Sequence, residues 1–351
     1  MANENKKELA LLVNKLNKKF GNNALVMGNE IEKQHQNRIP TGSVALDLDL
    51  GGGIPIGKFT QISGALSSTK TTQCVHIVRE AQKMGLVCGW GDVEGTSDKE
   101  YFENLGVNTE DLLYSRPDGL EELTQMILDM QNSGLVHLFV WDSIEASSPN
   151  KELDSTMDES TQLGTKPKLM NEFFRKYQAN NNRLVREGKR PFTLICINQL
   201  REKIGSYGDA EYTPGGRGIG FTTSVDLRLR KGDWITEGTG DNKTFVGQVV
   251  KYKIEKNKTY KRMQTGEFDF YYAPNKLDIP VHYNDNFKSI IQLAIDRDLI
   301  IQGGAWFYLN KGTEDEMKFQ GKDNLITYLR ANDELIEKIK KVILEIDSKT
   351  V

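Results

Sequence analysis

Apolar residues recur at two different spacings along this chain, and the spacing changes near residue 40. Before that point, four of them lie three or four residues apart, which is one face of an amphipathic helix: Leu9, Leu12, Val13 and Leu16. Residues 20–23 predict the turn that ends this helix, and residues 24–27 are predicted to form a short strand. Because a lone helix and strand cannot bury their own apolar faces, we expect residues 1–36 to pack on the rest of the chain or on another subunit.

From residue 40 onward, short apolar runs alternate with helical patterns. Five such runs are typical of strands buried on both faces of a sheet: 58–63, 86–90, 111–114, 136–141 and 192–198. The helices between them are predicted to begin near Lys70, Lys99, Gly119 and Thr161. This order predicts an α/β fold in which helices cover both faces of a central, mostly parallel sheet.

After residue 220 the pattern becomes a strict alternation of apolar and polar residues. Segments 223–229, 244–254 and 266–272 are predicted to add antiparallel strands to the same sheet. Residues 273–280 contain two prolines and are typical of a linker.

The remaining sequence predicts a small C-terminal α/β domain. Helical patterns at 288–298 and 333–346 flank a short strand near 306–309. We therefore expect three parts: a helix–strand segment over 1–36, a core over 37–275 and a small domain over 276–351.

Composition narrows the class of protein. The 351 residues are 27% charged and contain no apolar run of about 18 residues, so we expect no membrane-spanning segment. The N-terminal sequence lacks the pattern of a signal peptide, which predicts a cytoplasmic protein. Three cysteines lie too far apart for a disulfide framework or a zinc module, so we expect them to be buried: Cys74, Cys88 and Cys196.

The net charge of -3, from 46 basic and 49 acidic residues, argues against a protein that coats nucleic acid by bulk positive charge. The distribution is nevertheless uneven. Residues 91–160 hold 3 Lys/Arg against 17 Asp/Glu, whereas residues 161–262 carry a net charge of +11. Solvated faces explain such a split in an average protein, so charge alone does not decide the partner.

A strand, a loop and a helix around residue 64 have the order of a phosphate-binding loop. Residues 64–72 read G-A-L-S-S-T-K-T-T, the pattern G-x-x-x-x-G-K-T with Thr69 in place of the second glycine. Backbone N–H groups of such a loop hold phosphates, while Lys70 would reach the terminal phosphates and the Thr71 hydroxyl would ligate Mg²⁺. An ordinary strand–turn–helix is the alternative. The expected binding residues are Gly64, Ser67, Ser68, Thr69, Lys70, Thr71 and Thr72.

Two predicted strands end in acidic residues, which favours the nucleotide site. Asp142 follows the run 136–141, and the run 86–90 leads into Asp92 and Glu94. The carboxyl ends of neighbouring parallel strands line one crevice, so these carboxylates are expected beside the loop. Asp142 would hold Mg²⁺ together with Thr71, and Glu94 would polarise an attacking water. Solvent-facing acids at strand ends are the alternative to this nucleoside triphosphatase.

These motifs together resemble the RecA family of DNA strand-exchange recombinases over nearly the whole chain. The resemblance is carried by short sequences spread along it: Thr41-Gly42-Ser43, Leu46-Asp47, the loop before Lys70-Thr71-Thr72, Asp92-Val93-Glu94, Leu105-Gly106-Val107, Val140-Trp141-Asp142-Ser143, Ile197-Asn198-Gln199, Gly215-Gly216 and Gly304-Ala305-Trp306-Phe307. It implies a RecA-type P-loop ATPase core between an N-terminal oligomerisation segment and a small C-terminal domain.

The resemblance also implies roles for single residues in binding and hydrolysing ATP. Glu94 would activate the water, Lys70 would act on the terminal phosphates, and Gln199 would sense the γ-phosphate and couple it to the following loop. Three residues match positions that bind or stack on adenine: Asp98, Tyr101 and Tyr272. Lys256 and Lys258 match a pair that reaches the ATP held by the adjacent subunit, so nucleotide would control assembly.

Two loops match the DNA-binding loops of the family, at about 154–168 and about 202–216. By composition alone, both are ordinary surface loops. The residues expected to contact DNA in or beside them are Leu163, Gly164, Lys168, Arg175, Arg201, Lys203, Gly215 and Gly216. Phe221 matches a subunit-contact position.

The sequence departs from the family pattern at several points. A β-branched residue at Thr69 restricts the backbone, so either ATP binds more weakly or the loop keeps a negative φ there. Leu66, Gly220 and Asp226 replace charged positions of bacterial members, which alters the expected subunit contacts. The C-terminus lacks a long acidic tail, so autoinhibition by such a tail is not expected.

The interpretation is an ATP- and Mg²⁺-dependent recombinase that forms a helical homo-oligomer on single-stranded DNA and exchanges strands with homologous duplex. Single-strand-binding and loader proteins are possible further partners, and no membrane partner is expected. Two alternatives remain open. One is a ring-forming DNA motor with the same core, and the other is a non-hydrolysing scaffold in which Thr69 marks an inactive site.

Overall fold

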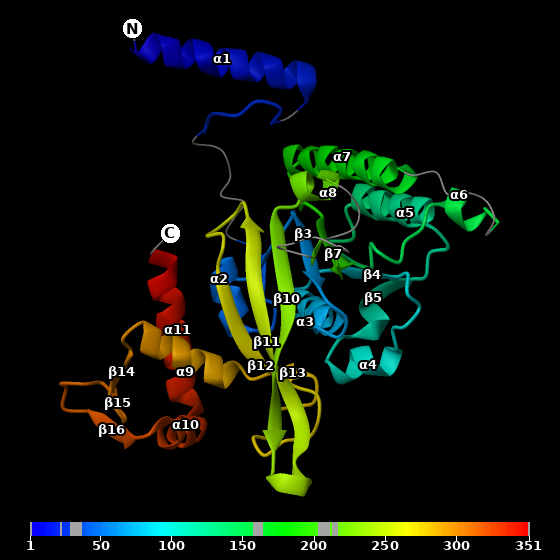
Figure 1. The fold of residues 1–351 in the computed structure, drawn as a ribbon. Coiled ribbons are helices and arrows are strands. Elements are labelled where there is room, and N and C mark those ends of the chain that lie inside the picture. Colours follow the sequence, from blue (N-terminus) through cyan, green and yellow to red (C-terminus); the bar gives the residue numbers. More distant parts are fainter. Residues whose placement is uncertain are drawn as a thin grey trace.

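The computed structural model describes residues 2–21, 23–28, 37–156, 164–202, 211–212 and 217–349. Within these residues, a nine-stranded sheet forms the centre of the molecule (Figure 1), in the order β13-β12-β11-β10-β3-β7-β6-β4-β5. Its strands are β3 (Phe59–Gly64), β4 (Cys88–Asp92), β5 (Leu112–Ser115), β6 (Leu138–Asp142), β7 (Thr193–Gln199), β10 (Val225–Glu237), β11 (Thr244–Asn257), β12 (Thr265–Tyr271) and β13 (Tyr283–Asn284). The prediction of an α/β fold with a central, mostly parallel sheet is confirmed.

One strand runs in a direction that was not predicted. Residues 223–229 were expected to lie antiparallel, but β10 pairs parallel with β3, with Val225 opposite Thr60. Parallel strands need a crossover of a dozen or more residues, and the chain after β7 is long enough to return to the amino edge of the sheet. There, the Ser224 N–H donates to Phe59 O at 2.8 Å and starts β10 beside β3. Strands β11, β12 and β13 then follow antiparallel.

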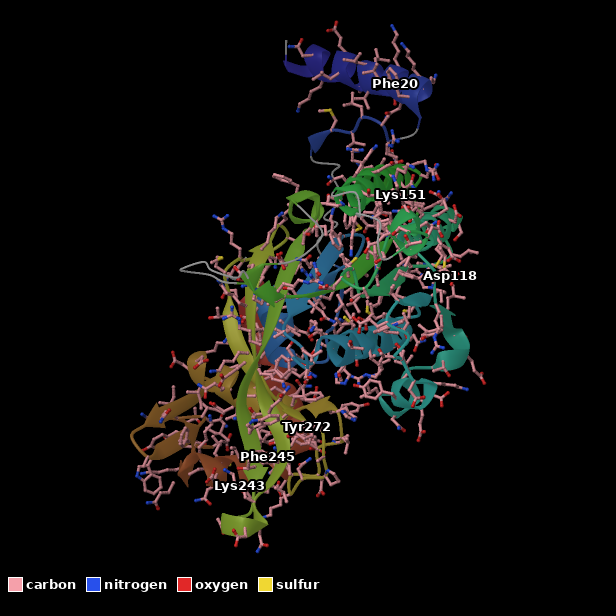
Figure 2. All side chains as sticks on the ribbon, turned by 45° about the vertical axis from the view of Figure 1, so that its right-hand side comes forward. Phe20, Asp118, Lys151, Lys243, Phe245 and Tyr272 are labelled. Atoms are coloured by element: carbon pink, nitrogen blue, oxygen red, sulfur yellow. The ribbon has the colours of Figure 1, made fainter. Side chains whose placement is uncertain are left out.

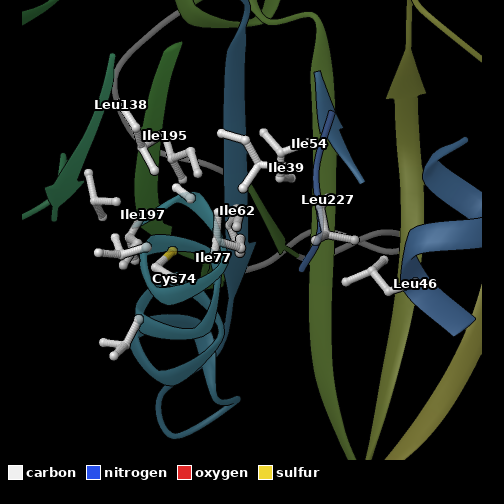
Figure 3. Close-up of a cluster of buried hydrophobic side chains, with 14 of the residues drawn as sticks. Ile39, Leu46, Ile54, Ile62, Cys74, Ile77, Leu138, Ile195, Ile197 and Leu227 are labelled. Atoms are coloured by element: carbon white, nitrogen blue, oxygen red, sulfur yellow. The ribbon is translucent and has the colours of Figure 1, made fainter. Parts of the chain in front are cut away.

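Helices cover both faces of the sheet. Helices α3 (Lys70–Lys83) and α4 (Lys99–Asn104) lie on one face, and α5 (Leu120–Ser133) and α7 (Thr165–Arg186) lie on the other. The helix start predicted near Thr161 lies outside the described residues, and α7 begins at Thr165 with Gly164 as its N-cap. Figure 3 shows the first core, in which Ile62, Leu138 and Ile195 pack against α3. Phe139, next to Leu138, enters the second core, so a strand buried on both sides reads as continuous apolar sequence.

Short elements complete the core. They are β1 (Arg38–Ile39), α2 (Val44–Leu50), β2 (Ile54–Pro55), η2 (Thr109–Asp111), α6 (Asn150–Leu153), β8 (Arg201–Glu202), β9 (Glu211–Tyr212), α8 (Arg217–Thr222) and η3 (Gly240–Asn242). Helix α2 was not predicted, because its sequence alternates Leu and Asp and has no helical period. Cys74, Cys88 and Cys196 are buried free thiols, as expected.

A third core holds the small C-terminal domain together. It is built from α9 (Asn286–Asp296), β14 (Ile300–Gly303), β15 (Trp306–Leu309), β16 (Met317–Gln320), α10 (Lys322–Arg330) and α11 (Asp333–Lys349). Leu48 of α2 belongs to the same hydrophobic core, so the small domain packs directly on the part of the chain that forms the central sheet. Lys288 and Asp269 add an ion pair of 2.6 Å across this contact. The domain limits at residues 36 and 275 stay predictions.

The N-terminal helix α1 (Ala2–Phe20) projects away from the sheet (Figure 1), and its apolar side chains Leu9, Leu12 and Phe20 are exposed. The strand predicted at residues 24–27 is wrong. The Asn17 side chain takes both backbone groups of Leu25, accepting its N–H at 2.8 Å and donating to its carbonyl at 2.9 Å, so neither is left for strand pairing. Among the described residues, no helix combines the length and apolar character needed to cross a bilayer.

Candidate functional site

The phosphate loop joins the fully buried strand β3 to helix α3. Glycine is required at Gly64, because a Cβ there would collide with Leu229 O and Ser68 Oγ. The loop closes on one carbonyl: Ser68 Oγ and Lys70 Nζ both donate to Ala65 O at 2.8 Å. Burial lowers the pKa of Lys70, and the carboxylates of Asp142 and Glu94 oppose that change. Lys70 therefore lies folded along the loop, near the predicted catalytic residue Glu94 and the predicted metal ligand Asp142.

Thr69 has a left-handed backbone, with φ 64° and ψ 16°. The alternative of a negative φ at this position is therefore wrong. A β-branched residue in this region costs about 1–3 kcal/mol, so the loop stores strain where the motif has glycine. The Thr69 hydroxyl donates to Ser68 O at 2.6 Å, within the loop itself. Thr69 therefore replaces the glycine of the motif at a position whose backbone conformation favours glycine.

The predicted magnesium ligands meet at the start of α3. Thr71 Oγ1 donates to Asp142 Oδ2 at 3.0 Å, which joins the first turn of α3 to the end of β6. Burial raises the pKa of Asp142 to about 7, and the nearby charges of Glu94 and Asp92 add to the rise. A hydroxyl and a carboxylate oxygen are the donors that Mg²⁺ prefers, so this pair fits the ion.

Glu94 and Gln199 contact each other directly. Gln199 Nε2 donates to Glu94 Oε1 at 3.0 Å, and the Ser143 hydroxyl donates to the same oxygen at 2.7 Å. The residue after Gln199 is tied to the phosphate loop, because the Leu200 N–H donates to Gly64 O at 3.2 Å. The ends of β4, β6 and β7 thus bring together the predicted water-activating carboxylate and the predicted γ-phosphate sensor.

Asp92 shapes the turn that carries Glu94, a role that the sequence did not reveal. Its carboxylate accepts the N–H groups of Gly95 at 2.8 Å and Ser97 at 2.9 Å, and the Tyr114 hydroxyl at 2.6 Å. Burial alone would raise the pKa of Asp92, but these hydrogen bonds outweigh it and lower the pKa. An acid at the end of a strand was the available signal; two of its partners lie in the following turn, and the third, Tyr114, lies on β5.

The predicted adenine residues divide into two groups. The Tyr101 hydroxyl shares a hydrogen bond of 2.6 Å with Thr72 Oγ1 on α3. Tyr101 and Tyr272 both pack at the rim of the core that contains α3. Asp98 instead caps α4, accepting the Glu100 N–H at 3.0 Å, and lines a separate cavity of about 390 Å³.

Lys256 and Lys258 lie near the amino-terminal end of the parallel strands, whereas the phosphate loop lies at their carboxyl-terminal end. Lys256 Nζ donates to Gly220 O at 2.6 Å, and Lys258 Nζ donates to Phe221 O at 2.9 Å. The last residues of β11, which include Lys256, pair with the first residues of β10, at the amino-terminal end of the parallel strands. A single chain therefore does not bring these lysines to its own phosphate loop.

The residues predicted to contact DNA are only partly described. Leu163, Lys203, Gly215 and Gly216 lie outside the described residues, whereas Gly164 precedes α7, and Lys168 and Arg175 are exposed on that helix. Exposed Arg201 forms an ion pair with Glu145, three residues beyond Asp142. Lys166 Nζ donates to the Glu145 carbonyl at 2.9 Å. Glu145 is a further residue that the sequence analysis missed, because its partner Arg201 is distant in the sequence and no motif near Glu145 indicates the pair.

Comparison with known proteins gives a consistent family. A model of the RecA N-terminal domain matches residues 7–275, and a model of the RecA C-terminal domain matches residues 288–346. Protein RecA of Aquifex aeolicus (strain VF5) is 36% identical over 344 residues, covering 97% of this chain and 93% of that protein. Chromosomal Protein RecA of Lactococcus lactis subsp. lactis (strain IL1403) is 36% identical over 338 residues, covering 96% and 82%. Protein RecA of Cutibacterium acnes is 34% identical over 343 residues, covering 97% and 92%. With both domains matched in order and such identity over nearly its whole length, the chain belongs to the RecA family.

Proposed function

We propose that this protein is an ATP-dependent recombinase that forms filaments on single-stranded DNA, pairs it with homologous duplex and exchanges strands in DNA recombination and repair. Family membership implies a DNA-dependent ATPase. The observation that carries the proposal is the Gln199–Glu94–Ser143 cluster beside the phosphate loop, which joins the predicted hydrolytic carboxylate to the segment leading into the second DNA loop.

In the proposed reaction, Lys70 leaves the Ala65 carbonyl and contacts the terminal phosphates of ATP. Thr71 and Asp142 would hold Mg²⁺, which when bound neutralises charge on those phosphates. Glu94 orients and polarises the attacking water. Gln199 exchanges its bond to Glu94 for one to the γ-phosphate, which displaces the chain that continues into Arg201. Hydrolysis removes that phosphate, and Gln199 returns to Glu94.

The same scheme makes assembly and DNA binding depend on nucleotide. Lys256 and Lys258, which lie far from their own phosphate loop, would contact ATP held by the adjacent subunit. The exposed apolar face of α1 supports packing on another copy. Basic residues around the two loops would contact DNA phosphates, so affinity should fall steeply with salt and show little sequence preference. A cytoplasmic site of action and contacts with single-strand-binding or loader proteins belong to this proposal.

The test is ATP hydrolysis with and without single-stranded DNA, paired with electron microscopy of the same samples. We expect DNA-stimulated hydrolysis, helical filaments with an ATP analogue, and loss of hydrolysis but not of filaments in Glu94→Gln. Glu103→Gln, an exposed acid on α4 paired with Lys99, is the matched control and should behave as wild type. Rings would support the DNA motor, and DNA binding without hydrolysis would support the scaffold.

A further inference from the structure

Three aromatic side chains gather where the β10–β11 hairpin extends along β12. The Trp234 ring is 5.6 Å from Phe245 and 6.2 Å from Tyr272, at interplanar angles of 70° and 86°. Figure 2 shows Phe245 and Tyr272 at this end of the sheet, with Lys243 near the tip of the hairpin. Trp234 and Phe245 are each 54% exposed, although large aromatic side chains usually bury most of their surface. We call these three residues the aromatic wall.

Two β-bulges decide which face of the sheet the aromatic wall occupies. Lys231 lies opposite Val250, but the next pair is Trp234 with Gln248, so β10 carries one extra residue. A second shift follows, from Ile235 opposite Gly247 to Thr236 opposite Phe245. Because a slip of one residue moves a side chain to the other face, Trp234 and Phe245 reach a face that regular pairing would deny them.

The first bulge depends on glycine, and the face it selects is the one that carries α3. A Cβ on Gly232 would come within 2.9 Å of the Val249 carbonyl oxygen. Gln248, opposite Trp234, also pairs with Phe270, which belongs to the core that α3 shares with Tyr101. Bulges beside functional sites commonly re-aim a side chain, and this one turns Trp234 toward the nucleotide face.

The hairpin also supports residues 272–282. This segment begins at Tyr272 and ends beside Tyr101, the other tyrosine predicted to contact the base. At its start, Tyr272 contacts Trp234. In its middle, Glu237 Oε1 accepts the Lys276 N–H at 2.8 Å. At its end, the His282 ring lies 5.2 Å from Tyr101, at 70°. Tyr101, in turn, is hydrogen-bonded to Thr72 of α3.

We propose that Trp234 is a positioning residue for the purine base of ATP, acting through Tyr272; this inference rests on the proposed function. A perpendicular contact lets Trp234 cover at most one face of the Tyr272 ring, so the other face can stack on a base. Lys231, whose Nζ lies 5.6 Å from the Trp234 ring centre, adds positive charge to the same end. Phe245 backs Trp234 from the other strand.

The experiment compares Trp234→Ser, Trp234→Phe and the control Trp306→Ser, which removes another partly exposed tryptophan, in the C-terminal domain. The equilibrium Kd for a fluorescent ADP with Mg²⁺ is measured without DNA, and KM and kcat for ATP with saturating single-stranded DNA. We expect Trp234→Ser to raise Kd and KM about three- to tenfold, as for loss of one aromatic contact, with kcat unchanged. Trp234→Phe should restore both, and the control should match wild type.

A spectroscopic measurement gives a readout that a merely structural role would not move. In a Trp306→Phe background, Trp90 and Trp141 are buried and Trp234 is the exposed tryptophan, so unlabelled ADP should change its emission. That change should vanish when Trp234→Phe is added.

Three results would overturn the inference. One is a Kd in folded Trp234→Ser that equals the wild-type value, and another is a fall in kcat with KM unchanged. A third is normal nucleotide binding with lost filament assembly, which would make the aromatic wall a subunit contact. Failure of the proposed function looks different, because the wild-type protein would then form rings or bind DNA without hydrolysing ATP, whatever the Kd of the Trp234 variants.

Discussion

Thr69 holds a left-handed conformation that its side chain disfavours, so its replacement by glycine should stabilise the protein. Relative to Thr69→Ala, which keeps a Cβ in the same conformation, we expect Thr69→Gly to raise the free energy of unfolding by about 1 kcal/mol. Urea titration of both variants measures this difference. A glycine variant less stable than the alanine variant would contradict the stored strain. ATP affinity of the glycine variant should equal or exceed that of wild type.

Asp142 should make nucleotide binding depend on pH. Burial raises its pKa to about 7, so near neutrality the carboxyl is partly protonated and Mg²⁺ must displace that proton. We expect the affinity for Mg²⁺–ADP to rise from about pH 6 to about pH 8 and to level off above. Calorimetric titration in two buffers of different ionisation enthalpy should detect proton release in wild type and much less in Asp142→Asn.

Unfolding measurements alone would not isolate Asp142. An acid whose pKa is raised on folding contributes stability at low pH that is lost as the pH rises through the folded value. Burial also raises the pKa of Asp47 to about 7, so both carboxyls would weaken the fold over the same range. Proton release on nucleotide binding separates them, because Asp47 bonds the Thr41 backbone and not the phosphate loop.

At the scale of elements, the ends of β6 and β7 are joined by two successive contacts. Ser143 and Gln199 both donate a hydrogen bond to Glu94. Two residues after each of them, Glu145 forms an ion pair with Arg201. The first contact lies at the nucleotide site, and the second holds an arginine that is predicted to bind DNA. If Arg201 binds DNA as proposed, Glu145 would compete with DNA phosphates for it.

Replacing Glu145 by Gln should strengthen DNA binding without nucleotide. We expect the affinity for a labelled single-stranded oligonucleotide to rise about two- to fivefold at fixed salt, the range of a partly exposed ion pair. Fluorescence anisotropy measures it. Glu103→Gln, which breaks the exposed Lys99 pair on α4, is the matched control. Equal affinities for the two variants would mean that Glu145 does not restrain Arg201.

The local sequence pattern predicted some strands and helices better than others. Strand β6 and the start of helix α3 were predicted within two residues, because continuous apolar runs and a Lys-Thr-Thr helix start are local signals. The direction of β10 was not, since a strand's sequence does not state which neighbour it meets. The strand at 24–27 failed because a side chain of the preceding helix took its backbone bonds.

At the scale of the whole molecule, α1 stands apart from the sheet with its leucines exposed. Asn23 links this segment to the core through a hydrogen bond of 3.2 Å to Arg186 O. Serine at Leu9 and Leu12 together should therefore abolish oligomer formation while ADP still binds. Sedimentation with and without DNA, combined with the ADP titration, checks both halves. Lys6→Ser on the same helix is the control, and loss of oligomers there would point to the whole helix and not its apolar face.

The structure shows where the acidic and basic stretches of the sequence lie. The acidic stretch 91–160 contains Glu94 and Asp142, and the basic stretch 161–262 contains Arg175, Arg201 and the Lys256–Lys258 pair near the amino-terminal end of the parallel strands. A near-zero total can therefore hide an acidic stretch and a basic stretch, which subunits would bring together in the proposed filament. The total of -3 therefore says little about DNA binding.

The sequence by itself determined which segments form strands and helices along the chain, the phosphate loop and the acidic strand ends, because each depends on residues close together in the chain. Only the tertiary structure decided that Gln199 meets Glu94, that Arg201 meets Glu145 and that two bulges turn Trp234 toward the face of α3. Those contacts depend on strand order and register, which are set by packing between distant segments. A shift of one residue reverses which face a side chain occupies, and no local pattern announces it.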